Sequence, residues 1–590
     1  MNTQESTQAS NFGFLKEHDE LFFQLAHSAE RVFSSDPNTT LIKLRQLGEA
    51  IAQHIAAASG IDLGEKLTQV ELLQRIHREI RLDPVVRELF HTLRIEGNKA
   101  THEFQTRHKD ALDGLKIARE LAVWFHRSFG QSAANFSPGR FIPPKDPSHD
   151  LRRLQSQIES LKHDLGHANV ELESSQQLNE LIAKEKAEYE SLAVAMDEES
   201  RTLAKQAQQF ELDLEAQKLE YESKIEKLQK QISAKEDSAR QQQKQEVSHK
   251  TQTASQSLVL NEELTRIIID TQLVEAGWEA DSQELTYANG NRPEKGTNKA
   301  IAEWPTEGGR ADYVLFAGLT PIAVVEAKKE NTNVAGKIRQ AERYSKGIKV
   351  EKPLLPAWEL AGRGQPWDCD DSETYKVPFV YSSNGRPYVK QLEEQCGTWF
   401  RDIRKSSNTR RALQSFHTPE GLLDRLSRSK AKAEEQLRKE PFSYLGLRDY
   451  QQKAIQATEM ALEQGANSAL LAMATGTGKT RTIIGLMYRF LKAERFKRIL
   501  FLVDRSALGQ QAVDSFNEAP LEQNFPLSKI YNGAELGDMA VEAETKIQVA
   551  TVQAMVRRTF LSDNPPPVDQ YDCIIVDEAH RGYTLAQEMT

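Results

Sequence analysis

The sequence predicts a multidomain chain: an all-α N-terminal domain, a long antiparallel helical hairpin or coiled coil, and two α/β domains. Three observations support this order. Apolar residues recur at helical spacing up to about residue 130, residues 150–253 contain almost no Gly or Pro, and helix and strand patterns alternate from Leu258 onward. At ~100–200 residues per domain, a chain of 590 residues can hold several cores.

Composition excludes several classes of protein. The formal net charge of -10 argues against a chain that is basic throughout, although a local basic stripe could still contact nucleic acid. The three cysteines, Cys369, Cys396 and Cys573, are too few for a disulfide framework, so no disulfide partner and a reducing, cytoplasmic location are expected. No apolar run approaches the ~18 residues of a membrane span, and the N-terminus lacks the pattern of a signal peptide.

Residues 1–145 are predicted to form a helical accessory domain. FLKEHDELFFQLAHSAERVF and LIKLRQLGEAIAQHIAAA both carry apolar residues at helical spacing. A stretch rich in Pro and Gly, Ser137–Asp150, marks its end.

Residues 146–253 are predicted to form a coiled coil or helical hairpin. Their apolar residues follow heptad spacing, which weakens over Lys184–Thr202 and suggests a break there. An antiparallel hairpin and an intermolecular coil remain equally possible. The polar segment Ser238–Thr253 suggests a flexible exit.

Residues 254–435 contain a predicted β-hairpin made of GRADYVLF and PIAVVEAKK. Folding it antiparallel places Asp312 roughly opposite Glu326, because paired residue numbers sum to about 637–638. Two opposed carboxylates repel each other unless a divalent cation such as Mg²⁺ lies between them. Lys328 shares a face with Glu326, so the pattern predicts metal-dependent phosphodiester hydrolysis.

This hairpin resembles the PD-(D/E)xK nuclease superfamily, although Ala311 stands where that family's name has proline. Gln340 and Tyr344, on the next predicted helix, resemble the QxxxY element of its RecB-like branch. The resemblance implies catalytic roles for Asp312, Glu326, Lys328, Gln340 and Tyr344, with the two acids as metal ligands. Such nucleases often carry a further acid on the preceding helix, where this chain has Glu263. A charged hairpin end without catalytic function is the alternative.

Residues 436–590 contain a phosphate-binding loop. Gly476 and Gly478 allow backbone N–H groups to turn toward phosphate oxygens around Thr477, Lys479 can bind the β- and γ-phosphates, and the Thr480 hydroxyl can coordinate Mg²⁺. The segments LLAMAT, ILFLVD, IQVATV and CIIVDE are expected to be strands of a parallel sheet.

The segment CIIVDEAH ends this predicted sheet. Asp577 can complete the Mg²⁺ shell, and Glu578 can polarise the attacking water. Acids at the end of an apolar strand are costly unless a cation compensates them. These residues and the loop predict ATP and Mg²⁺ as cofactors.

The same region resembles superfamily-2 helicases and DNA translocases. The resemblance implies that Gln451 contacts the adenine base and that Thr551 and Arg505 reach the DNA backbone, while His580 couples nucleotide state to its neighbours. These motors need a second RecA-like domain, and this chain ends ten residues after His580. An N-terminal fragment without ATP turnover is therefore expected, with an incomplete first RecA-like domain.

A nuclease directly before a superfamily-2 motor resembles the restriction subunit of type I restriction-modification enzymes. The resemblance implies ATP-dependent translocation on double-stranded DNA, cleavage of unmodified DNA away from the recognition site, and modification (methyltransferase) and specificity subunits as partners. A stand-alone DNA repair or defence helicase–nuclease and a non-catalytic scaffold are the alternatives.

RIEGNKATH, residues 94–102, resembles a signature of small helical domains related to the HEPN group, some of which cut RNA with an Arg and a His on one helix. Arg94 and His102 lie eight residues apart, and Gly97 is expected to interrupt the helix, so the spacing departs from the catalytic one. Capping by Asn98 and His102, or a docking surface, is the favoured interpretation.

Overall fold

A computed structural model describes most of the chain. The described residues are 10–61, 67–103, 106–131, 136–144, 214–235, 237–258, 260–328, 333–368, 373–388, 394–406, 408–503, 521, 533–535, 545–562 and 565–579. They fall into two compact units, Met1–Leu264 and Thr265–Thr590. None of the described helices combines the length and the apolar character that a membrane crossing requires.

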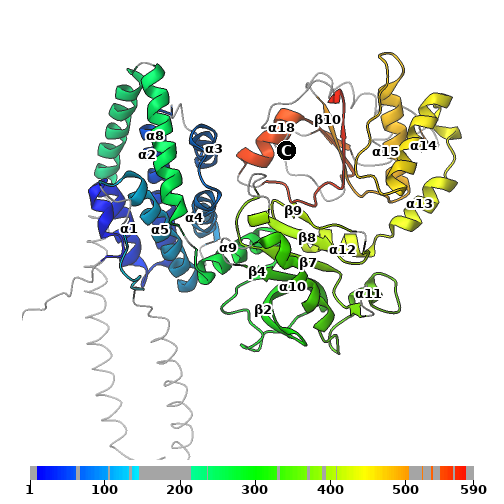
Figure 1. Cartoon of the computed structure of the whole chain (residues 1–590), viewed down its shortest axis with the longest axis horizontal. Coiled ribbons are helices and arrows are strands. Elements are labelled where there is room, and N and C mark those ends of the chain that lie inside the picture. The colour runs from blue at the N-terminus through cyan, green and yellow to red at the C-terminus, as the bar shows by residue number, and fades with distance from the viewer. Residues whose placement is uncertain are drawn as a thin grey trace, which may run out of the picture. The chain divides into compact units, whose positions relative to one another are not determined.

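The first unit is helical, as the sequence predicts. Three of its helices start at side chains that accept hydrogen bonds from the first turn: Asp19 caps one, Asp36 caps the next before Pro37, and Thr68 and Glu71 form a capping box. The elements are η1 (Gly13–Glu17), α1 (Glu20–Val32), α2 (Pro37–Ala58), α3 (Gln69–Ile80), α4 (Pro84–Glu103), α5 (His108–Phe129) and α8 (Asp237–Gln256) (Figure 1).

The polar segment predicted as a flexible exit is instead helix α8. Trp124 of α5 is fully buried, and its indole N–H donates to Ser255 Oγ of α8 at 3.0 Å. Residues 214–233 are also helical, and the hydroxyl of Tyr221 donates to the Ala50 carbonyl at 2.8 Å. The prediction failed because it weighed polarity alone, whereas packing on α5 orders the segment. The remainder of the predicted coiled coil, residues 146–213, lies outside the described residues.

Gly97 does not interrupt α4, which runs unbroken to Glu103. A Cβ at Gly97 would come within 2.6 Å of the Arg45 side chain of α2, so the glycine permits close helix packing. Arg94 is buried, and its guanidinium lies 3.2 Å from His91 Nδ1. The predicted capping residue His102 lies within α4, but its side chain is outside the described part of the chain.

The second unit begins with a seven-stranded sheet in the order β1-β2-β3-β4-β7-β8-β9. The hairpin predicted from the sequence is β3–β4, antiparallel as expected, and β4 pairs with β7 in parallel. The elements of this part are α9 (Glu262–Glu275), β1 (Glu279–Ala280), β2 (Asn298–Thr306), β3 (Gly309–Ala317), β4 (Thr320–Ala327), α10 (Val334–Gly347), α11 (Ala357–Leu360), β5 (Trp367–Asp368), β6 (Thr374–Tyr375), β7 (Phe379–Ser383), β8 (Thr398–Asp402), β9 (Arg411–Leu413) and α12 (Pro419–Ser427) (Figure 1).

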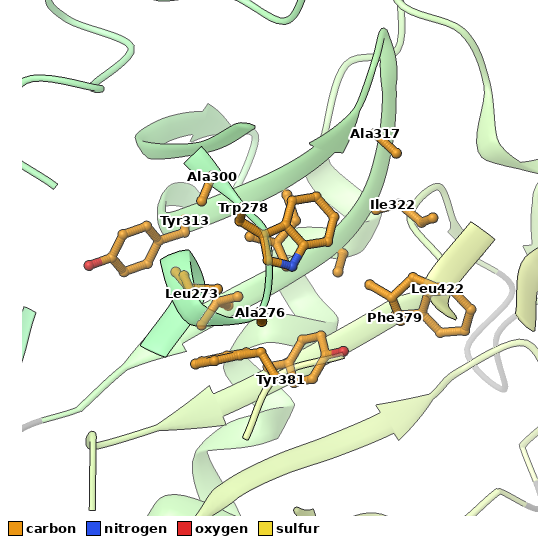
Figure 2. Close-up of a cluster of buried hydrophobic side chains, with 14 of the residues drawn as sticks. Leu273, Ala276, Trp278, Ala300, Tyr313, Ala317, Ile322, Phe379, Tyr381 and Leu422 are labelled. Atoms are coloured by element: carbon orange, nitrogen blue, oxygen red, sulfur yellow. The ribbon is translucent and has the colours of Figure 1, made fainter. Parts of the chain in front are cut away.

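Apolar cores cover both faces of this sheet. On one face, Trp278, Tyr313 and Tyr381 pack with Leu273 of α9 and Leu422 of α12 (Figure 2). On the other face, helix α10 packs its apolar residues, among them Val334, Ile338 and Tyr344, against the strands. Burial on both faces fixes the strand register, because a slip of one residue would exchange the two faces.

A smaller parallel sheet, in the order β11-β12-β10-β13, follows in the second unit. Three of the four predicted strands are confirmed as β10 (Ile499–Val503), β12 (Ile547–Thr551) and β13 (Cys573–Val576). The other elements are α13 (Lys430–Lys439), η3 (Ser443–Leu445), α14 (Asp449–Glu463), α15 (Lys479–Lys492), β11 (Gly533–Glu535) and α18 (Val552–Leu561).

The fourth predicted strand, residues 470–475, is not a strand. The segment has no regular secondary structure, and Leu470 is 85% exposed. Leu, Ala and Met have little β-propensity of their own, so such a segment depends on a neighbouring strand. Among the described strands β13 pairs with β10, and Ile574 of β13 is 55% exposed. The pattern of apolar residues was therefore insufficient to specify a strand.

Helix α12 connects the two sheets of the second unit. Its core residues Leu422 and Leu426 are buried against the larger sheet. Its cap residue Thr418 donates from its backbone N–H and its hydroxyl to one oxygen of Asp569, at 2.7 and 2.8 Å. A Cβ at Gly421 would overlap the Asp569 carboxylate, so a glycine is required in the first turn.

Gly421→Ala is therefore expected to lower the free energy of unfolding by about 1–3 kcal/mol, because Asp569 must move away from Thr418. Urea denaturation of the whole chain measures the change. Glu420→Ala, at an exposed position in the same turn, is the matched control and should have little effect.

Asp569→Ala should cost a similar amount, and combining it with Gly421→Ala should add little further destabilisation. If the two substitutions were additive, the overlap with Asp569 would not be the reason for the glycine.

Candidate functional site

The hairpin register places Asp312 and Glu326 on the same face of the sheet. Tyr313 pairs with Val325 and Val314 with Val324, which gives the predicted sum of 638. Tyr313 and Val325 both enter the core below α9, so the next opposed pair, Asp312 and Glu326, turns to the face that α10 covers.

Glu326 is a buried acid with an incomplete set of partners. Its side chain is 2% exposed, Oε1 forms an ion pair with Lys328, and Oε2 has no hydrogen-bond partner among the described residues. Burial, and then the negative charge of Asp312, raise the pKa of Glu326 to about 7, although Lys328 opposes the shift.

Asp312 is held by two donors. Its Oδ2 accepts a hydrogen bond from the Ala327 backbone N–H at 2.8 Å, and its Oδ1 lies 2.9 Å from Arg266 Nη2. Burial raises the pKa of Asp312, whereas the Arg266 charge lowers it. The backbone bond to Ala327 ties this carboxylate to the end of the strand that carries Glu326.

Arg266 and Glu303 were missed by the sequence analysis. Arg266, on α9, also lies 2.6 Å from Glu303 Oε1, so one guanidinium bridges two acids. Glu303 lies in β2 with φ of +53°, a left-handed conformation that is uncommon for a residue with a side chain. Neither residue belongs to a recognisable motif, and only the fold brings α9 and β2 to the hairpin.

Gln340 and Tyr344 lie one turn apart on α10. The Gln340 side-chain N–H donates to the Tyr344 hydroxyl at 3.0 Å, and Tyr344 packs beside Gly309 at the start of β3. Within the described part of the chain, no hydrogen bond links either residue to Asp312 or Glu326. Glu263 pairs with Lys116 at 2.7 Å.

The hairpin residues fit a magnesium ion that is held in part by substrate. The described residues contain no cluster of three or more His, Cys, Asp or Glu that would form a complete protein cage. Mg²⁺ commonly uses one or two carboxylates, with waters and phosphate oxygens in its other positions. The free Oε2 of Glu326 and the neighbouring Asp312 supply such a partial site.

The phosphate loop carries its glycines where the backbone requires them. Gly476 and Gly478 have φ of +81° and +79°, in the left-handed region. Lys479 and Thr480 open helix α15 directly after the loop, so the N–H groups of its first turn point toward the site that a phosphate would occupy. Thr477 is fixed by a 2.6 Å hydrogen bond from its hydroxyl to the Ala474 carbonyl.

Gln451 stabilises this loop through hydrogen bonds. Its amide nitrogen donates to the carbonyls of Thr477 and Gly478 at 3.0 and 3.2 Å, and its oxygen accepts from the Arg448 backbone N–H at 2.9 Å. A Cβ at position 478 would lie 2.6 Å from the Gln451 amide nitrogen. The predicted contact of Gln451 with adenine remains a prediction.

Asp577 and Glu578 follow β13, and Glu578 contacts the phosphate loop. Lys479 Nζ lies 2.9 Å from Glu578 Oε1, and Asp577 Oδ1 accepts a hydrogen bond from the Glu578 backbone N–H at 3.0 Å. Glu578 has φ of +51°, so the turn that presents its carboxylate is strained. The sequence analysis therefore identified two residues, 99 apart in the chain, that the fold brings into contact.

Thr551, Arg505 and His580 are the remaining predicted residues. The Thr551 hydroxyl caps α18 by accepting from the Ala554 N–H at 3.1 Å. Arg505 and His580 lie outside the described residues.

Three family models match the chain. Residues 279–426 match the second domain of the type I restriction enzyme EcoKI endonuclease subunit, residues 444–588 match the res subunit of type III restriction enzymes, and residues 27–124 match a domain of unknown function, DUF4145.

Curated relatives show the same relationship. The chain is 39% identical over 606 aligned positions to the type I restriction enzyme EcoKI endonuclease subunit of Escherichia coli strain K12, which covers 98% of this chain and 50% of that protein. It is 27% identical to the EcoAI endonuclease subunit of Escherichia coli, over 52% of this chain and 34% of that subunit. It is 35% identical to the putative ATP-dependent helicase IRC3 of Saccharomyces cerevisiae, over 23% of this chain and 19% of that protein.

The first two of these relatives are endonuclease subunits of type I restriction enzymes, and this chain spans about half the length of the first. With identity along nearly all of its own length and a family model centred on the larger sheet, the chain belongs to the family of type I restriction enzyme endonuclease subunits.

Proposed function

We propose that this chain carries the nuclease and the first motor domain of a type I restriction enzyme, which cleaves unmodified double-stranded DNA away from its recognition site with ATP and Mg²⁺. The observation that carries the proposal is the half-buried Asp312 beside the buried Glu326, with Lys328 on one oxygen of Glu326 and no partner among the described residues on the other. Two such acids and an ammonium group are the set that metal-assisted phosphodiester hydrolysis uses.

In the nuclease, Asp312 and Glu326 would hold the metal, and the bound cation would polarise the scissile phosphate and lower the pKa of a coordinated water. Lys328 would then leave the Glu326 carboxylate and position the attacking water or the phosphate. Arg266 holds Asp312 in place from the side of α9. Gln340 and Tyr344 would orient the substrate from α10.

In the motor, the loop from Gly476 to Thr480 would bind the nucleotide phosphates. Lys479 would exchange Glu578 for the β- and γ-phosphates, and the freed Glu578 would polarise the attacking water. Thr480 and Asp577 would complete the Mg²⁺ shell that accompanies ATP.

Modification and specificity subunits are the partners that this assignment requires, because nothing in the proposed nuclease site reads a base sequence. We propose residues 1–145 and 146–253 as a helical accessory domain and a helical hairpin, residues 254–435 as the nuclease and residues 436–590 as the motor domain. The first region would serve as a docking surface.

A stand-alone helicase–nuclease is the second candidate, because residues 444–588 match a helicase-type family that is not confined to type I enzymes. Co-purification with methyltransferase subunits would separate the two candidates.

Glu326→Gln should abolish DNA cleavage in the assembled enzyme while ATP hydrolysis continues, because only the nuclease metal site loses a ligand. In wild-type chain, Mg²⁺ or Mn²⁺ should raise the midpoint of thermal unfolding, and this effect should be lost in the variant. Glu351→Gln, at an exposed position, is the matched control. Persistent cleavage by Glu326→Gln would exclude this site as the nuclease.

The same substitution should stabilise the metal-free chain at high pH. Glu326 has an ordinary pKa of 4.5 that rises to about 7 in the fold, so the folded state holds the proton more tightly and loses stability as the pH rises from 4.5 to 7. Above pH 7, Glu326→Gln should therefore gain about 1–3 kcal/mol over wild type, and the gain should vanish near pH 4.5. Urea denaturation in chelator at several pH values measures it.

Lys479→Ala should weaken binding of ATP with Mg²⁺ by about 10–100-fold, because the phosphates lose a charge-assisted hydrogen bond. Glu578→Gln should keep or increase the affinity for ATP, since Lys479 would no longer have to break an ion pair with a carboxylate before it binds the phosphates. Titration with a fluorescent nucleotide measures both, and Lys453→Ala on α14 is the control. Weaker binding by Glu578→Gln would show that the ion pair organises the site and does not compete with nucleotide.

A further inference from the structure

A group of cationic side chains surrounds Phe400 near the β9 edge of the larger sheet. Phe400 of β8 pairs directly with Arg411 of β9, and Arg425 reaches the same ring from α12. Both guanidinium carbons lie 5.5 Å from the centre of the Phe400 ring. Phe400 belongs to the core below α9 and α12, so this group lies on the opposite face from Asp312 and Glu326.

The positive charge of this group is not balanced by its neighbours. Two acids lie near Arg425, and both already have other partners: the Asp402 oxygens accept from Arg404 at 2.9 and 2.8 Å, and Oδ2 of Asp569 accepts from Thr418. Neither Arg411 nor Arg425 forms an ion pair or a hydrogen bond with another described residue, and Nε of Arg425 is buried without an acceptor. Arg425 therefore holds a buried donor that the described fold does not satisfy.

The pKa shifts of these residues also indicate that their positive charges repel one another. Burial lowers the pKa of Arg425, and the charges of Arg404 and Arg428 lower it further, although Asp402 opposes them. Partial burial and the charge of Arg425 lower the pKa of Arg411. Lys430 is also affected: burial, Arg495 and Arg425 lower its pKa. Arg425 is half-buried, whereas Arg411 and Lys430 are exposed, so water screens part of the repulsion among these charges and a bound anion would relieve the rest.

Packing on Phe400 alone does not account for the pair. A single arginine on the ring would provide the cation–π contact without repulsion, whereas the second one adds a like charge and leaves a donor unmet. The guanidinium fork is suited to two oxygens of one phosphate. Arg411, Arg425, Lys430 and Lys479 of the phosphate loop line one cavity, whose lining also includes acids such as Asp402, Asp424 and Glu434.

We propose that Arg411 and Arg425 form a phosphate-binding site for the backbone of a polynucleotide, separate from the nuclease metal site and on the side of the sheet that faces the nucleotide loop. The proposal deepens the proposed function, because it assumes that DNA is the substrate. A bound backbone phosphate would accept from the Arg425 fork and from Arg411, and Phe400 would hold both guanidinium groups in place.

The test is duplex DNA binding by the chain in chelator, so that no cleavage occurs, followed by fluorescence anisotropy over a series of salt concentrations. Arg411→Gln with Arg425→Gln should weaken binding by about tenfold or more near 0.1 M salt. The slope of log affinity against log salt should fall by about one for each arginine. Arg411→Lys should keep most of the slope, because it keeps the charge.

Arg410→Gln is the matched control, since it removes the same charge one residue away while its guanidinium lies over Trp399. An equal loss of affinity in the control and in the double variant would overturn the proposal. Stability gives a second measure: without DNA, Arg425→Gln should unfold at the same or a higher temperature than wild type, because it relieves repulsion. A clear loss of stability would indicate a packing role.

A free anion is the competing ligand. If inorganic phosphate stabilises wild type but not the double variant, while duplex affinity and salt slope are unchanged, the site binds small anions and the proposal for polynucleotide fails. The nuclease assignment is tested separately by Glu326→Gln, whose effect on cleavage does not depend on these arginines. The phosphate-site proposal and the nuclease assignment can therefore fail independently.

Discussion

Repulsion between two carboxylates at the end of one β-hairpin is the constraint on which the proposed nuclease site depends. The β3–β4 register fixes Asp312 opposite Glu326, and the surrounding residues supply positive charge or donors to both. Lys328 meets one acid, and Arg266 and the Ala327 N–H meet the other. One oxygen of Glu326 has no hydrogen-bond partner among the described residues, and a cation would be stabilised most at this position.

The phosphate loop, like the hairpin, contains a lysine that forms an ion pair with a glutamate. Lys479 rests on Glu578, as Lys328 rests on Glu326, so each site holds an internal ion pair where a ligand is expected. Binding of phosphate or metal would exchange one partner for another and would avoid creating a new buried charge, which is costly. Both sites can therefore remain folded without ligand, and under the proposed function both lysines would change partner on ligand binding.

The sequence predicted contacts between residues that are close in the chain better than contacts between distant segments. The Asp312–Glu326 pairing follows from a two-residue turn and strand alternation, so it was predictable. Arg266 and Glu303 reach the same site from α9 and β2, and no spacing rule connects them to the hairpin. Residues 470–475 failed as a strand for the opposite reason: an apolar pattern is local, but a strand exists only with a neighbour.

Helix α12 shows why such distant contacts matter. It has nine residues, too few for a stable isolated helix, so its position depends on what it touches. Leu422 fixes it to the core of the larger sheet, and Asp569, shortly before β13, fixes its first turn through Thr418. Arg425, one turn later on the same helix, is thereby held beside Phe400. The placement of that charge is consequently set in part by Asp569, which belongs to the segment that leads to Asp577 and Glu578.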